Sequence, residues 1–348
     1  MNQKLEAFWV GTVALVALLM LDAYVRDSPT PQNDELIYHR MASQPFDPHT
    51  FVFAYRVAVP TLVHVMPFGY EFSFSLLAWL FTAGCASLTY LLLRRFEISK
   101  PFAAGLGLAF ALCPTLFVAS LRQGANVDPE SVFVMLAGAI AIVDRRPVAL
   151  GLIVLVGVLV RESTLFLVPF AYAVWAERLW DPRAVGRVLL LSLPGIAAYA
   201  ALRLSLPTVA REQIIGYDSL LGGRRDVLRA AAEDPQYPLR RVALAFGPLW
   251  LAAPFALRDL RFARAGLVLI ACCLVSMTFA LDWGRIILLA APVVLVAAAW
   301  ALRHRPRLAA LAVGSFMAMN IGYAIYMEDF KGAQNGIVEV DPSPYEVR

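Results

Sequence analysis

Long apolar runs separated by short polar stretches set the pattern of the whole chain. An apolar run of about 20 residues can cross a bilayer as a helix. These runs do not alternate apolar and polar positions, as a membrane barrel strand would, so the pattern predicts helices. About eleven spans are expected, at roughly 7–25, 71–93, 101–120, 130–143, 147–160, 164–177, 185–203, 241–257, 264–281, 285–302 and 307–327.

Composition gives the same class. The chain has 348 residues, of which 60% are hydrophobic and 16% charged, and its mean hydropathy is +0.66. Soluble domains contain about 45–50% apolar and about 25% charged residues. We therefore predict an all-α polytopic membrane protein that forms one transmembrane domain over residues 1–348. Its polar parts are two outer loops, 26–70 and 204–240, and a tail at 328–348.

The short basic loops predict the orientation. Every second loop is rich in Lys and Arg, as cytoplasmic loops are: "RRFEISK", "DRRP", "ERLWDPRAVGR", "RDLRFAR" and "RHRPR". With these loops inside, only 6 of the 26 acidic residues are cytoplasmic. The first apolar run has no small-residue cleavage site behind it, so it is predicted to be a retained span. Residues 26–70 then lie outside the cytoplasm.

Two outer segments are predicted to contain non-spanning helices. Residues 51–68 are apolar but include Arg56, Pro60 and His64, so an interfacial or re-entrant helix is preferred to a span. Within 204–240 the sequence predicts a Gly-Gly turn at 222–223 and a short helix over 224–234.

Several function classes are excluded. The four cysteines lie inside apolar runs and form neither a disulfide framework nor a CxxC metal site. HExxH, a GxSxG elbow and a Walker loop are absent from the sequence. A net charge of +4 does not indicate a nucleic-acid partner, and none is expected.

Ionisable and polar side chains instead gather at the predicted outer ends of the spans. Charges at mid-bilayer cost roughly 2.5–3.5 kcal/mol each on insertion scales, although the cost falls towards the interface. The candidate site residues are Asp34, Glu35, Tyr38, His39, Arg56, Arg122, Asn126, Asp128, Arg161, Glu162, Asp282 and Arg285.

Each candidate also has a purely structural interpretation. Asp34 and Asp128 are suitable helix N-caps, and Pro129 suits the first helical position. Asp282 and Arg285 could form an i, i+3 ion pair, while Arg161 and Glu162 could simply make a turn. Arg56 and Arg122 could extend to lipid headgroups. The functional interpretation rests on the placement of all these residues at one face.

A carboxylate beside several arginines suits group transfer from a lipid phosphate. Arginine binds phosphate through charge and a two-pronged hydrogen-bond geometry. A carboxylate can act as general base towards an acceptor hydroxyl. The residues therefore indicate transfer from a phosphate-bearing lipid to an acceptor outside the cytoplasm.

The stretch "NDELIYHRMA" at 33–42, after a first span and before many others, resembles the acidic "DE-x-x-Y" type of motif in the GT-C superfamily of membrane glycosyltransferases. The resemblance implies a polyprenyl-phosphate-linked sugar donor and an extracytoplasmic glycan or lipid acceptor. It also implies that Asp34 is the base, with Glu35 as its neighbour and alternative.

The remaining roles follow from that resemblance. Arg56, Arg122 and Arg285 would stabilise the lipid phosphate, and Tyr38, His39 and Asn126 would bind sugar hydroxyls. No cofactor is required; a divalent cation, Mg or Mn, held by Asp34, Glu35 or Asp128 stays open. The expected location is a bacterial-type inner (plasma) membrane, with membrane lipids as surroundings.

Two alternatives remain. An oligosaccharide polymerase that uses a lipid-linked oligosaccharide would have a similar number of spans and similar outer arginines. A lipid or solute transporter would place its ionisable groups near the membrane midplane, often on interrupted helices.

Overall fold

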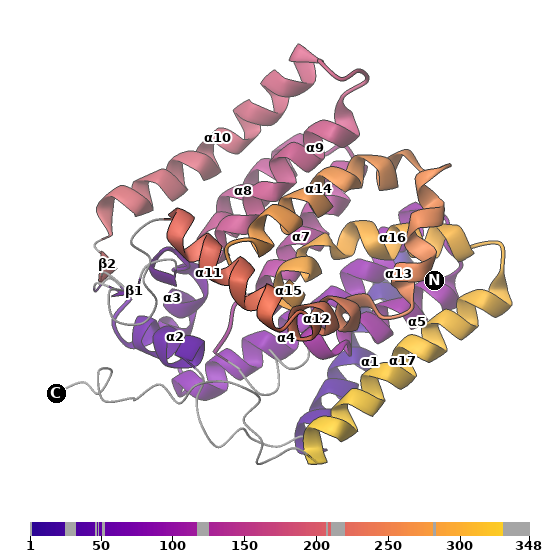
Figure 1. Ribbon diagram of the computed structural model, residues 1–348, viewed down its shortest axis with the longest axis horizontal. Coiled ribbons are helices and arrows are strands. Elements are labelled where there is room, and N and C mark those ends of the chain that lie inside the picture. Colours follow the sequence, from indigo (N-terminus) through magenta and orange to yellow (C-terminus); the bar gives the residue numbers. More distant parts are fainter. Residues whose placement is uncertain are drawn as a thin grey trace.

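The structure is a computed structural model that describes residues 2–24, 33–45, 47, 49–50, 53–116, 125–206, 208–209, 220–280 and 283–329. Within these ranges the side chains of 23–24, 33–34, 49–50, 208–209, 220–226, 237 and 324–329 are not described. Figure 1 shows an assembly of helices, which confirms the all-helical prediction. The described residues add only one pair of two-residue strands, β1 (His49–Thr50) and β2 (Thr208–Val209).

The α-helices are α1 (Gln3–Tyr24), α2 (Asn33–Ser43), α3 (Ala58–Val65), α4 (Tyr70–Arg95), α5 (Lys100–Ala111), α7 (Asp128–Val143), α8 (Pro147–Val160), α9 (Leu167–Trp175), α10 (Pro182–Ser205), α11 (Leu220–Glu233), α12 (Gln236–Phe246), α13 (Leu249–Ala252), α14 (Arg261–Met277), α15 (Trp283–Ile287), α16 (Ala291–Leu302) and α17 (Pro306–Asp329). The 3-10 helices are η1 (Phe53–Tyr55), η2 (Glu162–Phe166), η3 (Ala253–Leu257) and η4 (Leu288–Ala290).

Four described segments are long and apolar enough to cross a membrane: Gln3–Asp22, Tyr70–Arg95, Pro182–Ser205 and Trp283–Leu302. A fifth is obtained if Leu249–Leu257 and Arg261–Met277, bent by 119°, count as one broken span. These long apolar helices are typical of a helical integral membrane protein. The count of about eleven spans stays a prediction, because the other described helices are shorter or less apolar.

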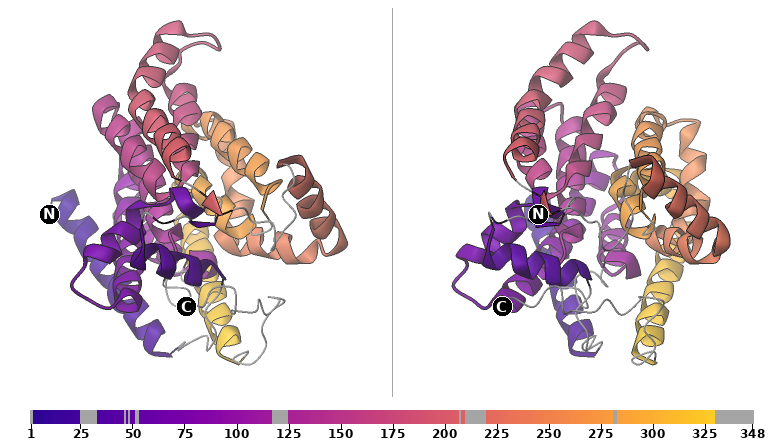
Figure 2. Two further views of the ribbon diagram at one scale, coloured as in Figure 1. Left: turned by 90° about the vertical axis from the view of Figure 1, so that its left-hand side faces the viewer. Right: turned by 60° about the vertical axis from the view of Figure 1, so that its left-hand side comes forward.

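The helix α4 lies at the centre of the N-terminal half, where it packs against α1, α5 and α7. The helix α7 in turn packs against α8 and α9. In both views of Figure 2 the hairpin formed by α9 and α10 projects beyond the remaining helices. Buried leucine, valine, alanine and phenylalanine side chains fill the contacts between helices. Asn320 of α17 donates to the carbonyl of Ala109 in α5 over 2.7 Å, which fixes the last helix to the bundle.

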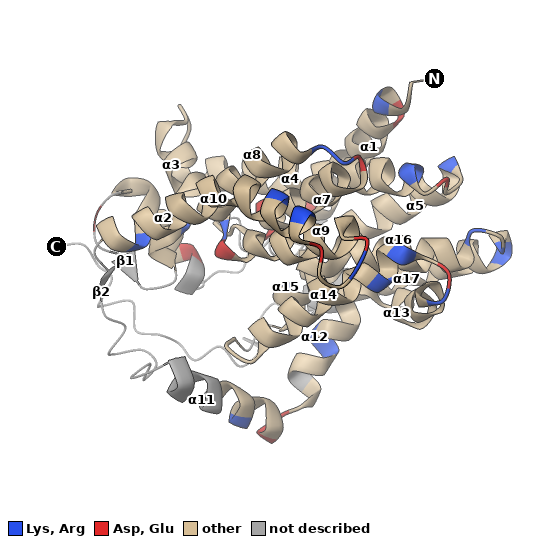
Figure 3. Cartoon of the chain, turned by 90° about the horizontal axis from the view of Figure 1, so that it is seen from above, with Lys and Arg blue, Asp and Glu red and all other residues tan. Residues whose placement is uncertain are grey.

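The end of the molecule that carries the basic loops is held by ion pairs. Arg95 at the end of α4 makes two hydrogen bonds, of 3.0 and 3.1 Å, to Asp144 at the end of α7. Glu6 of α1 accepts from Tyr90 over 2.5 Å and from Lys100 over 2.7 Å. Figure 3 shows Lys and Arg on several loops at this end. These contacts keep α1, α4, α5 and α7 in register.

The other end carries α2 and α3, which are tied together by a 2.7 Å contact between His64 Nδ1 and the Ala42 carbonyl. The helix α3 has 8 residues and is about 12 Å long, too short for a hydrocarbon core of about 30 Å. The described residues 53–68 therefore form no span, in agreement with the preference stated above. The parallel pair of β1 and β2 joins this loop to the end of α10.

One prediction for the second outer loop is right and one is wrong. The short helix predicted at 224–234 corresponds to α11, which ends at Glu233. The predicted Gly-Gly turn is wrong, because Gly222 and Gly223 lie inside α11. Flanking helix-forming residues override the low helix propensity of glycine, which amounts to about 1 kcal/mol per residue. Most of the predicted tail, 330–348, lies outside the described residues.

The orientation can be tested with two serine-to-cysteine variants. Ser43 is exposed at the end of α2, and Ser99 is exposed in the basic loop before α5. We expect Ser43→Cys in intact cells to react with a membrane-impermeant thiol reagent. Ser99→Cys should react only after the membrane is permeabilised. The native cysteines 85, 113 and 273 are buried, so a Cys272→Ser background suffices. The reverse labelling pattern would invert the topology.

Candidate functional site

Charged and polar side chains from four distant segments converge where α7, α8 and α15 meet the segment that carries α2, η1 and α3. Two arginine–carboxylate groups form there, each with a carboxylate that receives guanidinium hydrogen bonds. We call this set the arginine cluster. It contains Arg56 after η1, Asn126 and Asp128 at the start of α7, Arg161 and Glu162 between α8 and η2, and Arg285 in α15.

The first group is centred on Arg56. Its Nη2 and Nε donate to the two carboxylate oxygens of Glu162 over 2.7 and 3.1 Å, a two-pronged geometry. Its Nη1 donates to the hydroxyl of Tyr38 over 3.2 Å, and the guanidinium lies 5.1 Å from the centroid of the Phe53 ring. The Arg56 side chain is 7% exposed and that of Glu162 is 31% exposed. Arg56 is therefore held rigidly, with its charge largely removed from water.

The second group is centred on Asp128, whose side chain is 1% exposed. One carboxylate oxygen accepts from Arg161 and the other from Arg285, so both oxygens are occupied. The two arginines are 11% and 17% exposed. A buried carboxylate between two guanidinium groups fixes both of them in position.

Asn126 extends the second group. Its side-chain oxygen accepts from Arg285 over 3.0 Å and from the backbone N–H groups of Val127 and Asp128 over 2.7 and 3.1 Å. An amide oxygen with three donors has no lone pair left for a sugar hydroxyl. The oxygen of Asn126 thus positions Arg285 and the start of α7, and the predicted contact of Asn126 with sugar hydroxyls stays a prediction.

The start of α7 differs from the prediction. Asp128 was expected to cap the helix, but it is the first helical residue, and its side chain bonds arginines rather than backbone N–H groups. Asn126 accepts from the first N–H groups in its place. The proline predicted at the helix start is present at Pro129. The cap interpretation of Asp128 is wrong because a buried carboxylate gains more from two cations than from backbone donors.

A glycine allows α8 to end next to η2. A Cβ atom at Gly157 would lie 2.5 Å from Thr164 and 2.6 Å from Val134, so any side chain there would displace η2 or α7. The chain reverses immediately after α8, and Arg161 has an extended backbone. The two adjacent residues Arg161 and Glu162 therefore reach opposite groups of the arginine cluster.

The arginine cluster shifts the pKa of one of its own carboxyl groups. Burial on its own would raise the pKa of the Glu162 carboxyl, but the charge and hydrogen bonds of Arg56 lower it to about 2. Glu162 is therefore ionised at every physiological pH. Among its described residues, the arginine cluster has three positive side chains and two negative ones, which add up to +1. The positive ones are Arg56, Arg161 and Arg285, and the negative ones are Asp128 and Glu162.

Tyr38 and His39, adjacent on α2, point to different neighbours. Tyr38 reaches Arg56, whereas the ring of His39 packs on Phe74 of α4, with centroids 5.4 Å apart. Glu35 lies in the first turn of α2 and is half-buried. Arg122 and Asp282 lie outside the described residues, as does the side chain of Asp34. The structure does not test their predicted roles.

The sequence analysis did not include Arg203 among the candidate site residues. Arg203 at the end of α10 lies 4.8 Å from the centroid of Tyr55 and 5.6 Å from that of Tyr199. The two tyrosine rings meet edge to face at 6.1 Å. Tyr199 and Arg203 are four residues apart, hence on one helix face, and Tyr55 precedes Arg56. The sequence signal that could have identified Arg203 was its spacing of four residues from Tyr199 at the predicted outer end of a helix.

The described residues contain no group of three or more His, Cys, Asp and Glu side chains with the geometry of a metal site. Asp128, one of the three candidates for a cation ligand, has both oxygens bonded to arginines. A divalent cation at Asp128 would have to share these two oxygens with two guanidinium groups.

No family model and no curated protein matches the chain. Among solved structures, the fold is similar to an oligosaccharyltransferase of Archaeoglobus fulgidus, solved in complex with Zn and sulfate. The TM-score is 0.51 at 14% identity, over 94% of this chain and 54% of that one. A second structure, the archaeal oligosaccharyltransferase AglB from Archaeoglobus fulgidus with an inhibitory peptide and a dolichol-phosphate, matches with a TM-score of 0.44 at 14% identity, over 92% of this chain and 55% of that one. The chain spans about half the length of these proteins, and the likeness is one of fold.

Proposed function

We propose that the chain is an integral membrane glycosyltransferase of the GT-C type. It would move a sugar from a polyprenyl-phosphate carrier to a glycan or lipid acceptor on the extracytoplasmic face of the plasma membrane. The observation that carries the proposal is the convergence of Arg56, Arg161 and Arg285 beside the first outer loop. The fold, which is similar to that of an oligosaccharyltransferase, supports it as an analogy.

The arginine cluster suits a phosphate that leaves with increasing negative charge. Guanidinium groups bind phosphate through two parallel hydrogen bonds, and fixed donors in a dry site cost no reorganisation at the moment of reaction. Glu162 and Asp128 already orient these arginines.

The proposed reaction is a single displacement at the anomeric carbon. Asp34 accepts the proton of the acceptor hydroxyl, whose oxygen forms the new bond to the anomeric carbon. The bond from that carbon to the phosphate oxygen breaks, through a state with oxocarbenium character. The arginines stabilise the polyprenyl phosphate that departs. Glu35 is the neighbouring carboxylate that could take the place of Asp34.

The proposed binding residues divide into candidates for direct contact and residues that position others. Arg122, Asp282, Tyr38 and His39 stay candidates for contacts to donor or sugar. Arg56 and Arg285 have partners that orient them, whereas Asn126 and Asp128 are better suited to positioning than to direct contact. About eleven spans with an outer active site remain part of the proposal.

A transporter is the rival from another class. The paired charges of the described chain lie at the ends of helices, as with Arg56–Glu162 at one end and Arg95–Asp144 at the other. Transporters tend to place such groups near the midplane on interrupted helices. A polymerase is the nearer rival, and the donor separates the two: a single lipid-linked sugar favours a glycosyltransferase and a lipid-linked oligosaccharide favours a polymerase.

Binding of polyprenyl monophosphate to the purified protein tests the arginines. We expect Arg56→Ala and Arg285→Ala each to weaken binding about 10- to 150-fold, since one charge-assisted contact contributes about 1.5–3 kcal/mol. Arg56→Lys should restore binding only in part, because lysine cannot form a two-pronged contact with a phosphate. Retention of a radiolabelled polyprenyl phosphate in detergent gives the affinity.

Glu162→Gln is the matched control, because it breaks the same ion pair from the other side. If Arg56 serves only to pair with Glu162, both variants should behave alike. If Arg56 binds phosphate, Glu162→Gln should keep or strengthen binding while Arg56→Ala loses it. Equal affinity in the wild type and in both alanine variants would make the arginines structural only.

A further inference from the structure

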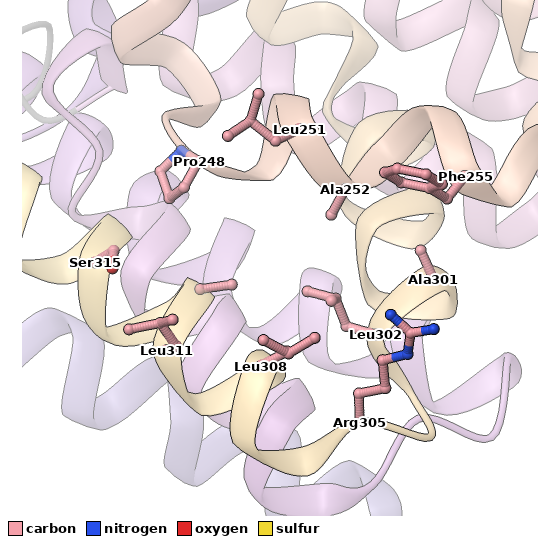
Figure 4. Close-up of a pocket in the computed structure, with 11 residues that line it drawn as sticks. Pro248, Leu251, Ala252, Phe255, Ala301, Leu302, Arg305, Leu308, Leu311 and Ser315 are labelled. Carbon is pink, nitrogen blue, oxygen red and sulfur yellow. The ribbon is translucent and has the colours of Figure 1, made fainter.

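A groove lies at the opposite end of the protein from the arginine cluster, between α13–η3 and the turn from α16 to α17. Its volume is about 440 Å³, within the range of about 300–1,000 Å³ typical of ligand pockets. Figure 4 shows Leu251 and Phe255 along one wall and Leu308 and Leu311 along the other. Both walls end at basic loops that are predicted to be cytoplasmic.

The groove is open towards the surface that a bilayer would cover. Leu251 is 77% exposed, Phe255 is 75% exposed and Leu311 is 64% exposed. Large apolar side chains on such a surface are stable against hydrocarbon and unfavourable against water. A hydrocarbon chain is therefore the occupant that the lining suits.

One cation lies in this apolar lining. The guanidinium of Arg305 borders the groove beside Ala301 and Leu302 (Figure 4). No acidic side chain of the described residues forms an ion pair with it. The neighbouring Arg303 is engaged, because its guanidinium lies 3.5 Å from the centroid of Trp300 and donates to the Trp300 carbonyl. Arg305 is thus the cation available to a ligand in the groove.

The surrounding charge is also positive. Arg258 lies in the turn between η3 and α14, and Arg261 and Arg264 lie in the first turn of α14. Asp259 is the acid within this turn, and it lies 4.0 Å from Arg258. Basic pockets between membrane helices on the cytoplasmic side attract anionic headgroups, with about 1 kcal/mol per Lys or Arg near the surface.

We propose that this groove binds an anionic phospholipid of the cytoplasmic leaflet. One acyl chain would lie between Leu251, Phe255, Leu308 and Leu311, and the headgroup phosphate would contact Arg305. The site is independent of the arginine cluster and of the proposed function. It would anchor the broken helix formed by α13–η3 and α14 to the last two helices through a bound lipid.

Native mass spectrometry of the full chain tests this. The protein is reconstituted in nanodiscs that contain equal amounts of phosphatidylglycerol and phosphatidylcholine, transferred to mild detergent, and examined for retained lipid. We expect the wild type to retain phosphatidylglycerol in preference. Arg305→Ala should reduce the preference roughly five- to tenfold. The control Arg307→Ala removes one positive charge from the first turn of α17, outside the groove lining, and should lower the preference less than Arg305→Ala does.

A second pair of variants tests the groove itself. Ser315 lines the groove, so Ser315→Phe should fill it and lower the retention of both lipids. A Cβ at the adjacent Gly314 meets no atom within 4 Å, so Gly314→Phe should change nothing. Unaltered retention in both Arg305→Ala and Ser315→Phe would overturn the proposal. Equal losses in Arg305→Ala and Arg307→Ala would also overturn it.

Discussion

Replacement of Asp34 with asparagine is expected to reduce sugar transfer by about 10²- to 10⁴-fold, the contribution of a positioned general base. Asparagine has the same shape but cannot take up the acceptor proton. Asp34 is the second residue of α2. The lost charge in that first turn should cost only about 0.3–1 kcal/mol of stability. Binding of polyprenyl phosphate should change much less than turnover.

The assay follows release of polyprenyl phosphate from lipid-linked sugars extracted from the native membranes. Glu35→Gln, the same change at the next position, is the control. Normal transfer by Asp34→Asn with loss in Glu35→Gln would move the base to Glu35. Normal transfer by both variants would remove the base from the proposal and leave α2 as a helix of the outer loop.

Replacement of Asp128 with asparagine should cause the largest loss of stability. The carboxylate is 1% exposed and bonds Arg161 and Arg285. Removal of one partner from a buried ion group leaves the other charges uncompensated and costs about 3–5 kcal/mol. We expect a clear fall in the midpoint of thermal unfolding in detergent, together with weaker binding of polyprenyl phosphate.

The same helix provides the control. Asp144 follows the other end of α7 and pairs with Arg95, where the two side chains are 16% and 26% exposed. Because that pair lies nearer to water, Asp144→Asn should cost only about 1 kcal/mol. If both variants unfold at the same temperature, Asp128 does not hold the arginines and the second group of the cluster loses its assigned role.

Apolar runs predicted the helices because the bilayer imposes a simple length rule, and the described helices lie where the runs are. Details set by packing were not predictable in the same way. Gly222 and Gly223 indicated a turn by local propensity, yet they continue α11. The bend of 119° between Leu249–Leu257 and Arg261–Met277 depends on neighbouring helices and leaves no unambiguous mark in the sequence.

The sequence analysis named the residues of the arginine cluster as candidates but did not predict which of them bond to each other. The sequence places Arg161 beside Glu162, but the structure pairs Arg161 with Asp128 and Glu162 with Arg56. Partners 33 and 106 residues apart depend on how α7 and α8 pack, which a periodic pattern does not encode. Arg203 was missed because a single cation at a helix end resembles an ordinary interfacial anchor.

The length of α7 has a consequence for the membrane itself. Its 16 residues span about 24 Å, whereas a typical hydrocarbon core is about 30 Å thick. Asp128 and Asp144 mark its two ends, and ion pairs hold each of them. If α7 crosses the bilayer, as the sequence predicts, local thinning is one of the ways in which a membrane accommodates a helix that is too short for it. The arginine cluster would then lie at the bottom of a dimple in the outer leaflet, at a depth that a carrier phosphate reaches while its chain stays among the lipid tails.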